Sequence, residues 1–311
     1  MRRIENVIIS GPTGAIGMAL IDELISNDIN VTCVVNPDSK RIDRIRESDK
    51  VSIVKCDLRD IKNLKKYIDE AREAGDLIPK SYDAFYHFAW MNTFGEGRND
   101  ISAQMDNVRY AMDAIDAASD LGVKLFIGAG SQAEYGRSNE ALRSDTPVFP
   151  ENGYGIAKLA AGQFGKIRAC QLDMEFIWTR VLSVYGPFDG EKTLVQSMIS
   201  KLKAGVIPET TRGEQIWDFL YSKDCARAFY LIAKNGKNMK TYVIGSGKGR
   251  PLREYIEEIR DTVSSGAMIN FGAIPYAEKQ VMYLVADISE LRRDTGFVPE
   301  VEFKDGIKSM L

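Results

Sequence analysis

The sequence has little of what metal sites, disulfide frameworks and membrane spans require. It contains one histidine, His87, so a histidine-rich metal site is not available. The four cysteines, Cys33, Cys56, Cys170 and Cys225, are scattered without a Cys-x-x-Cys pair, which predicts reduced thiols. No apolar run is long enough to span a bilayer, and no signal-peptide hydrophobic region precedes the first strand-like segment. We therefore expect a cytoplasmic protein with no metal and no membrane partner.

The charge balance also excludes a class of partner. The 311 residues include 41 Lys and Arg against 44 Asp and Glu, a net charge of -3, so no basic field points to nucleic acid. Hydrophobic residues make up 44% of the chain, which is ample for a core. The length fits one large α/β domain, or a main domain with a smaller one attached.

Apolar segments of strand length alternate with amphipathic segments of helix length over the first 181 residues. The predicted strands are Ile4–Ser10, Val31–Val35, Val51–Val54, Tyr82–Phe88, Lys124–Ile127 and Phe176–Val181. The predicted helices are Ala15–Ser26, Ile61–Ala74, Ile101–Ala118 and Tyr154–Gln171. This alternation indicates parallel strands buried on both faces, so the predicted fold is a doubly wound α/β sheet of the Rossmann type.

A glycine-rich turn, Gly11-Pro-Thr-Gly14-Ala-Ile-Gly17, joins the first predicted strand to the first predicted helix. Gly11 can take backbone angles closed to other residues, Gly14 lets a phosphate approach the main chain, and Gly17 lets the helix pack on the strand. Free N–H groups at a helix N-terminus favour a diphosphate. The turn therefore predicts a dinucleotide site; the alternative is a plain strand-to-helix turn. The site includes Gly11, Thr13, Gly14, Ala15, Ile16 and Gly17.

Tyr154 and Lys158 are four residues apart in a predicted helix, and such residues lie on one helix face. A neighbouring ammonium favours the phenolate form, so the pKa of Tyr154 is expected to fall from about 10 towards working pH. A proton donor or acceptor of that strength suits carbonyl reduction or alcohol oxidation.

The end of the second predicted strand bears on the choice of cofactor. An acidic residue there binds the ribose 2′-hydroxyl of NAD, but this chain has Asn36. Ser39, Lys40 and Arg41 follow within reach of a 2′-phosphate, which favours NADP(H). NAD(H) is the alternative, with Asp38 holding the ribose while the two basic residues begin a solvated helix.

After about Val181 the rhythm breaks into shorter elements between proline and glycine turns. We predict a dinucleotide-binding domain over 1–181 and a smaller, mixed substrate-binding lobe over 182–311. Segments near 215–245, notably Trp217–Leu220 and Thr241–Ile244, are expected to return to the main sheet.

Further segments occur in a fixed order along nearly the whole chain. They are Cys56-Asp57-Leu58-Arg59-Asp60, Tyr86-His87-Phe88-Ala89-Trp90, Asn107, Ser131-Gln-Ala-Glu-Tyr135-Gly136, Arg180-Val-Leu-Ser-Val-Tyr-Gly-Pro187, Trp217–Asp224 and Tyr242–Gly247. Together with the glycine turn and the Tyr154–Lys158 pair, they make the chain resemble an extended short-chain dehydrogenase/reductase (SDR). More narrowly, it resembles the NAD-dependent epimerase/dehydratase family, which acts on nucleotide sugars.

The resemblance implies roles for individual residues. Ser131 bonds the substrate oxygen, Tyr154 exchanges the proton, Lys158 holds the nicotinamide ribose and tunes Tyr154, and Asn107 braces the site. The alternatives to these roles are that Ser131 is only a turn hydroxyl and that Asn107 only bonds the backbone. The implied cofactor contacts are Asp57, Leu58, Phe88, Ala89 and Trp90. Asp57 is also a candidate helix cap. His87 is interpreted as structural, and Tyr185 as a packing residue.

The reaction is predicted by elimination. Dehydratases of the family carry Asp-Glu after the Ser or Thr, but this chain has Gln132 and Ala133, which disfavours dehydration, and Glu134 is expected to point elsewhere. With NADP(H) favoured, the leading prediction is an NADPH-dependent reductase of a nucleotide-linked 4-keto-6-deoxy sugar. The alternatives are a C4 epimerase with tightly bound NAD and a non-catalytic dinucleotide sensor.

Two positions depart from the family pattern on the substrate side. Ser183 stands where the family usually has Asn, and Trp217 stands where it usually has Arg. Arg212, Lys192 or Arg250 are candidates to replace the missing cation. The predicted substrate contacts are Gln132, Ser183, Arg212 and Trp217. The resemblance also implies a homodimer through the helices that carry Asn107 and Tyr154.

Overall fold

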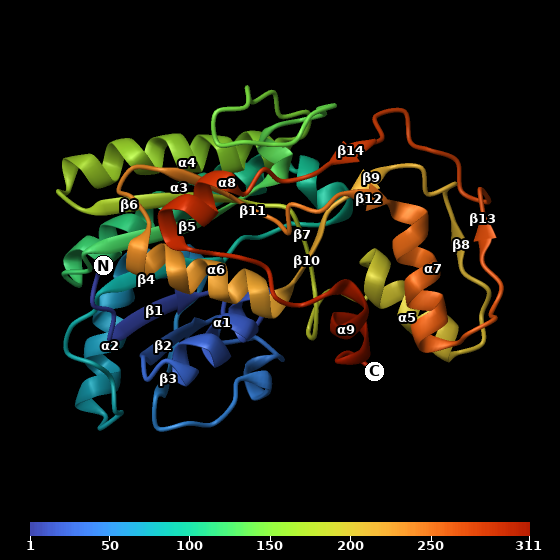
Figure 1. Ribbon diagram of the computed structural model, residues 1–311. Helices are drawn as coiled ribbons and strands as arrows, with labels where there is room; N and C mark the ends of the chain where they lie inside the picture. The colour runs from blue at the N-terminus through green and yellow to red at the C-terminus, as the bar shows by residue number, and fades with distance from the viewer.

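The computed structural model describes residues 1–311, and its main element is a seven-stranded parallel sheet (Figure 1). All six neighbouring pairs in this sheet are parallel. From one edge to the other, the strands are β3 (Val51–Lys55), β2 (Asn30–Val35), β1 (Asn6–Ser10), β4 (Ala84–His87), β5 (Leu125–Ser131), β6 (Glu175–Val181) and β11 (Thr241–Ile244). The predicted doubly wound Rossmann fold is confirmed.

Helices cover both faces of the sheet (Figure 1). One face carries α1 (Ala15–Ser26), α6 (Ser222–Asn235) and α8 (Ser289–Thr295), and the other carries α2 (Leu64–Glu73), α3 (Ile101–Asp120) and α4 (Gly153–Gln171). Side chains alternate along each strand. Val7 and Ile9 of β1 therefore enter the core under α1 and α6, whereas Ile8 enters the core under α3 and α4.

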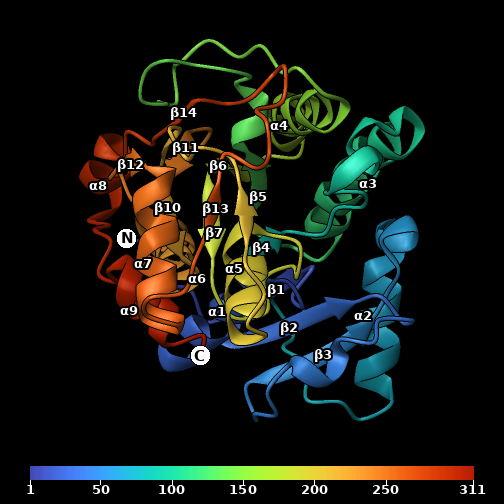
Figure 2. The same cartoon turned by 90° about the vertical axis from the view of Figure 1, so that its right-hand side faces the viewer.

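A smaller lobe is built from the second half of the chain, and Figure 2 views the molecule from its side. Its core lies among α5 (Leu194–Lys203), α7 (Leu252–Val263) and α9 (Phe303–Lys308). Its strands form three small sheets. These pair β7 (Ser183–Tyr185) with β10 (Phe219–Tyr221), β8 (Glu209–Thr210) with β13 (Asn270–Phe271), and β9 (Ile216–Trp217) with both β12 (Arg250–Pro251) and β14 (Tyr283–Leu284).

Two sequence expectations differ from the structure. Thr241–Ile244 does return to the main sheet, as β11, but Trp217–Leu220 does not, because β11 already occupies the edge of β6 and β9 and β10 pair within the small sheets. The predicted helix Ile61–Ala74 begins as a 3-10 turn, η2 (Leu58–Asn63). The other 3-10 turns are η1 (Ile42–Arg44), η3 (Gly95–Asn99) and η4 (Gln132–Glu134). The domain boundary at 181 stays a prediction.

The sheet order places a topological switch point at β1. β1 pairs with β2 on one side and with β4 on the other, so the connections that leave their carboxyl ends diverge. Open α/β sheets bind ligands in the crevice at such a point. No helix of the structure has both the length and the apolar composition that crossing a bilayer requires.

Candidate active site

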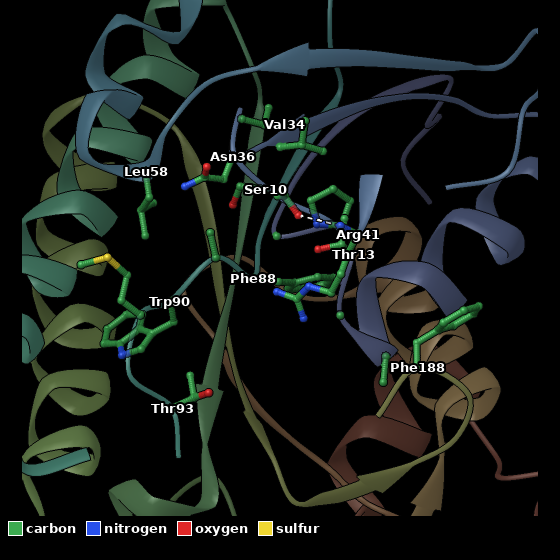
Figure 3. Close-up of a pocket in the computed structure, with 18 of the residues that line it drawn as sticks. Ser10, Thr13, Val34, Asn36, Arg41, Leu58, Phe88, Trp90, Thr93 and Phe188 are labelled. Carbon is green, nitrogen blue, oxygen red and sulfur yellow. Dashed lines mark hydrogen bonds between the residues drawn. The ribbon is translucent and has the colours of Figure 1, made fainter. Parts of the chain in front are cut away.

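A cavity of about 570 Å³ opens at the carboxyl ends of β1, β2 and β4 (Figure 3). Most of the residues predicted to contact a cofactor line it. They are Gly11, Thr13, Gly14, Ala15, Asn36, Ser39, Arg41, Leu58, Phe88, Ala89 and Trp90. The other predicted contacts, Ile16, Gly17, Asp57, Tyr154 and Lys158, do not line the cavity.

The glycine turn forms the cavity wall beside α1. Gly11 has φ +73, and a Cβ on it would lie 2.6 Å from the Ala89 nitrogen, so only glycine fits there. Gly14 caps α1 without a side-chain hydrogen bond, and its Cβ position is open. The first turn of α1 holds no acidic residue, so its free N–H groups and the helix dipole offer an anion site.

The end of β2 presents an amide and basic residues to the cavity. The Asn36 side chain donates to the Asp57 carboxylate at 2.9 Å, and Asp57 also accepts from Arg59 at 2.8 Å while it caps η2. Hydrogen bonds from Arg59, and then from Asn36, hold the pKa of Asp57 below its usual range. Asp57 does not line the cavity, and neither does Asp38.

A second arginine, Arg44 of η1, lines the cavity and was not identified from the sequence. Its guanidinium lies 5.7 Å from the ring centre of Phe188, which lines the same cavity from the loop after β7. The signal in the sequence is the spacing: Arg44 follows Arg41 by three residues, so one turn of chain brings both to the same side.

Tyr154 and Lys158 lie on α4, as predicted, but no hydrogen bond joins the ammonium to the phenol. Lys158 is buried, and its Nζ donates to the Ala129 carbonyl at 2.6 Å. Nζ lies 3.7 Å from the ring centre of Trp90 and 5.8 Å from that of Tyr154. The cation nearest the phenol ring is Arg98 of η3, at 4.8 Å.

The expected drop in the pKa of Tyr154 is therefore wrong for this structure. Burial raises the pKa of Tyr154 above its ordinary value, and the neighbouring Ser131 hydroxyl and Arg98 oppose that rise only in part. Burial also lowers the pKa of Lys158 to about 7, with the Glu134 carboxylate acting in the opposite direction. Desolvation is the largest cause of both shifts.

Trp90 connects the cavity to this corner. Its indole lines the cavity, covers the Lys158 ammonium and meets the Tyr154 ring edge-on at 6.3 Å. Gln104 of α3 accepts from the indole N–H at 2.9 Å. Asn107 accepts from the Met91 N–H and donates to the Met91 carbonyl, both at 2.9 Å, so its side chain holds the segment that carries Trp90.

Ser131 ends β5 at the start of η4. Its Oγ accepts from the Ala133 N–H at 3.2 Å, which leaves the hydroxyl proton free to donate to another oxygen. Ser131 is close enough to Tyr154 to lower the pKa of the phenol. The structure thus brings Ser131, Tyr154 and Lys158 to one corner, while Asn107 bonds the Met91 backbone next to Trp90.

A sequence model of the NAD dependent epimerase/dehydratase family matches residues 7–245. The chain belongs to this family. The resemblance inferred from the motifs is confirmed, and with it the prediction of an enzyme of the extended SDR type. Membership also supports a nicotinamide dinucleotide as the cofactor.

The relatives of this epimerase/dehydratase chain differ in activity. It is 26% identical over 314 residues to the CDP-abequose synthase of Salmonella typhimurium, covering 99% of this chain and 97% of the relative. It is 24% identical over 318 residues to an Escherichia coli dTDP-4-dehydro-6-deoxyglucose reductase, with coverage of 99% and 97%. The solved UDP-N-acetylglucosamine 4-epimerase of Methanobrevibacter ruminantium M1 superposes with a TM-score of 0.85 at 23% identity, covering 99% and 97% of the two chains.

The two departures from the family pattern, Ser183 and Trp217, contact each other. The Trp217 indole N–H donates to the Ser183 hydroxyl at 2.8 Å. Arg250 is unavailable as a replacement cation because it pairs with Glu258 and stacks on Tyr255. The remaining predicted substrate contacts are Gln132, partly exposed beside Ser131, and Arg212, exposed on the smaller lobe.

His87 and Tyr185, which the sequence analysis interprets as structural, are both buried and hydrogen-bonded within the fold. His87 is buried and bonds Ser10 at 2.8 Å, and burial lowers the pKa of its ring to about 3, so the imidazole is neutral. Tyr185 is buried and donates to the Phe303 carbonyl at 3.2 Å.

Proposed function

We propose that the protein is an NADPH-dependent reductase of a nucleotide-linked 4-keto-6-deoxy sugar. The observation that carries this proposal is the composition of the cavity at the end of β2. Asn36 stands there in place of a carboxylate, and Ser39, Arg41 and Arg44 line the wall. Two guanidinium groups and a hydroxyl suit a 2′-phosphate, which arginine binds with paired hydrogen bonds.

The residues present fit a dinucleotide. The cavity has a volume of about 570 Å³, and the uncapped N-terminus of α1 faces it. A bound nicotinamide cofactor supplies the hydride in such a reaction. The chain supplies the diphosphate site at Gly11 to Ala15 and the 2′-phosphate site at Arg41 and Arg44, while Lys158 lies under Trp90 and outside the cavity lining.

The proton chemistry is assigned to the corner beside Trp90. Tyr154, a phenol that holds its proton at neutral pH and whose pKa burial raises, gives its phenolic proton to the C4 oxygen of the sugar. Ser131 donates its free hydroxyl proton as a hydrogen bond to the same oxygen and steadies the developing charge. The Lys158 ammonium, fixed by the Ala129 carbonyl, adds positive charge on the cofactor side.

Dehydration is disfavoured because no acid/base pair follows Ser131. Ala133 is apolar and buried, and Glu134 is buried with its carboxylate already bonded. Net reduction and C4 epimerisation remain. The structural likeness to a 4-epimerase supports epimerisation as the second candidate.

Two measurements on the purified protein separate these functions. A thermal-shift panel of CDP-, dTDP-, GDP- and UDP-sugars, each with NADP⁺ or NAD⁺, identifies the stabilising pair, since a bound ligand raises apparent stability by mass action. A reductase consumes NADPH in proportion to the 4-keto sugar added. An epimerase instead retains NAD(H) through purification and shows no net loss of NADPH, which would overturn the reductase proposal.

The outer faces of α3 and α4 support a homodimer. These neighbouring helices expose large apolar side chains that nothing in the chain covers, and a second copy packed as a four-helix bundle would bury them. They are Ile101, Met105, Ile156, Phe164 and Ile167. Light scattering should give a dimer for the wild type and a monomer for Phe164→Asp; a monomeric wild type contradicts this assembly.

A further inference from the structure

Glu134 lies behind Ser131 and is fully buried. One carboxylate oxygen accepts from the Ser131 backbone N–H at 2.9 Å and from the Trp178 indole N–H at 3.0 Å. The other accepts from Arg180 Nε at 2.8 Å. Three donors from two neighbouring strands, Ser131 at the end of β5 and Trp178 and Arg180 on β6, therefore converge on one side chain of η4.

The surroundings are shaped to admit this carboxylate. A Cβ on Gly130 would lie 2.2 Å from the Glu134 oxygen, so any larger residue there would displace it. The same turn supports the helix that carries Tyr154, because a Cβ on Gly155 would lie 2.3 Å from the Ala133 carbonyl oxygen. A shift of the turn at residues 131–134 would therefore be transmitted to both Ser131 and Tyr154.

We propose that Glu134, paired with Arg180, is a positioning residue for the reaction: its carboxylate holds the Ser131 backbone so that the Ser131 hydroxyl faces the Tyr154 phenol. This inference rests on the proposed roles of Ser131 and Tyr154. Ser131 meets the substrate, whereas Glu134 acts only through it.

Arg180 compensates the buried negative charge of Glu134 by pairing with its carboxylate. Its side chain is 5% exposed, lies 4.5 Å from the Tyr135 ring centre and donates to the Ser144 carbonyl at 3.2 Å. Removing either partner alone leaves an unpaired buried charge, which disrupts a fold for reasons unrelated to Ser131. The informative variants therefore remove both charges together.

Two double variants differ in whether residue 134 has an oxygen that can accept from the Ser131 and Trp178 N–H groups. Glu134→Gln with Arg180→Met keeps an oxygen that accepts from the Ser131 N–H, whereas Glu134→Leu with Arg180→Met keeps similar bulk without an acceptor. We expect kcat of the Leu variant to be about tenfold to a hundredfold below that of the Gln variant, the loss typical of a misplaced reacting group. The KM for cofactor should be unchanged. Equal kcat values in two folded variants would overturn the proposal.

A titration provides a readout that needs no turnover. The Tyr154 phenol, followed by NMR of ¹³Cζ-labelled tyrosine and assigned with Tyr154→Phe, faces Arg98 of η3, residue 134 of η4 and Lys158 of α4. Residue 134 is uncharged in both double variants, so neither adds a charge near the phenol, and they differ in the hydrogen bonds that position the Ser131 hydroxyl. Because that hydroxyl lowers the pKa of Tyr154, the Leu variant should titrate at higher pH than the Gln variant. Coincident titrations would overturn the proposal.

Glu175→Gln is the matched control. Glu175 begins β6 and pairs with Arg2, so this variant breaks an Arg–Glu pair at the opposite end of the strand that carries Arg180. It should change neither kcat nor the titration of Tyr154. If the Leu variant does not fold, Glu134→Met with Arg180→Met replaces it. If the wild type turns over no sugar of the panel, the reductase and epimerase proposals fail, while the titration still decides the role of Glu134.

Discussion

The dinucleotide cavity and the corner that holds Tyr154 differ in how they are built. Two sides of the cavity come from short stretches of chain: the glycine turn from Gly11 to Ala15, and Asn36, Ser39, Arg41 and Arg44 after β2. The corner is made by side chains from distant parts of the chain: Trp90, Arg98, Ser131, Tyr154 and Lys158. Short-range geometry shapes the first region, whereas desolvation and packing set the chemistry of the second. The two regions should therefore respond separately to substitution.

Tyr154→Phe is expected to give the largest difference between the two regions, with a loss of kcat but not of cofactor binding. Loss of the proton donor should lower kcat by about 10²–10⁴-fold, while stabilisation by NADP⁺ persists, because Tyr154 does not line the cavity. Steady-state kinetics and thermal shift on the same preparation measure both quantities. A variant that keeps more than about a tenth of wild-type kcat would contradict the assigned role.

The reverse pattern is expected for Arg41→Ala. Removing a charged hydrogen-bond donor from the 2′-phosphate site should weaken NADPH binding by about 1.5–3 kcal/mol, or roughly ten- to a hundredfold in Kd. NADH binding should be nearly unchanged. Lys40→Ala is the matched control, since Lys40 does not line the cavity. Equal losses for NADPH and NADH would indicate that Arg41 does not read the 2′-phosphate.

The desolvation of Lys158 should also affect the pH dependence of the reaction. Burial lowers the pKa of Lys158 to about 7, so in the free enzyme the ammonium is lost as pH rises through that value and is retained below it. Because kcat/KM reports groups of the free enzyme, it should fall by about tenfold per pH unit above pH 7. A profile that stays flat to pH 9 would show that Lys158 remains charged or is not required.

The smallest expected effect is a change in the fluorescence of Trp90, the residue at which the cavity and the Tyr154 corner meet. Trp90 lines the cavity and covers Lys158, so a dinucleotide that enters the cavity changes the surroundings of its indole. Tryptophan fluorescence should therefore change on titration with NADP⁺ and lose most of that change in Trp90→Phe. The chain has three tryptophans, and Trp217→Phe is the comparison. A full response in Trp90→Phe would separate Trp90 from the cofactor.

The prediction of the fold from sequence was accurate where one element dictates its own structure. Helix Ala15–Ser26 has the predicted bounds, and six predicted strands occur in the main sheet. The prediction that Trp217–Leu220 joins the main sheet was wrong. The sequence of so short a strand does not predict which strand it pairs with, because pairing depends on which sheet edge is free. Arg44 and Glu134 were missed or set aside, since their importance lies in what they touch rather than in a local pattern.

The sequence by itself determined the sheet, the glycine turn, and the placement of Tyr154 and Lys158 on one helix, because these follow from the period of apolar residues and from backbone geometry within a few residues. Only the tertiary structure decided that Arg98 rather than Lys158 lies nearest the phenol ring, that Trp90 covers the ammonium, that Ser183 and Trp217 bond each other, and that Glu134 meets Arg180 across 46 residues of chain. Burial and the pairing of distant side chains set these features, and both depend on the whole chain being folded.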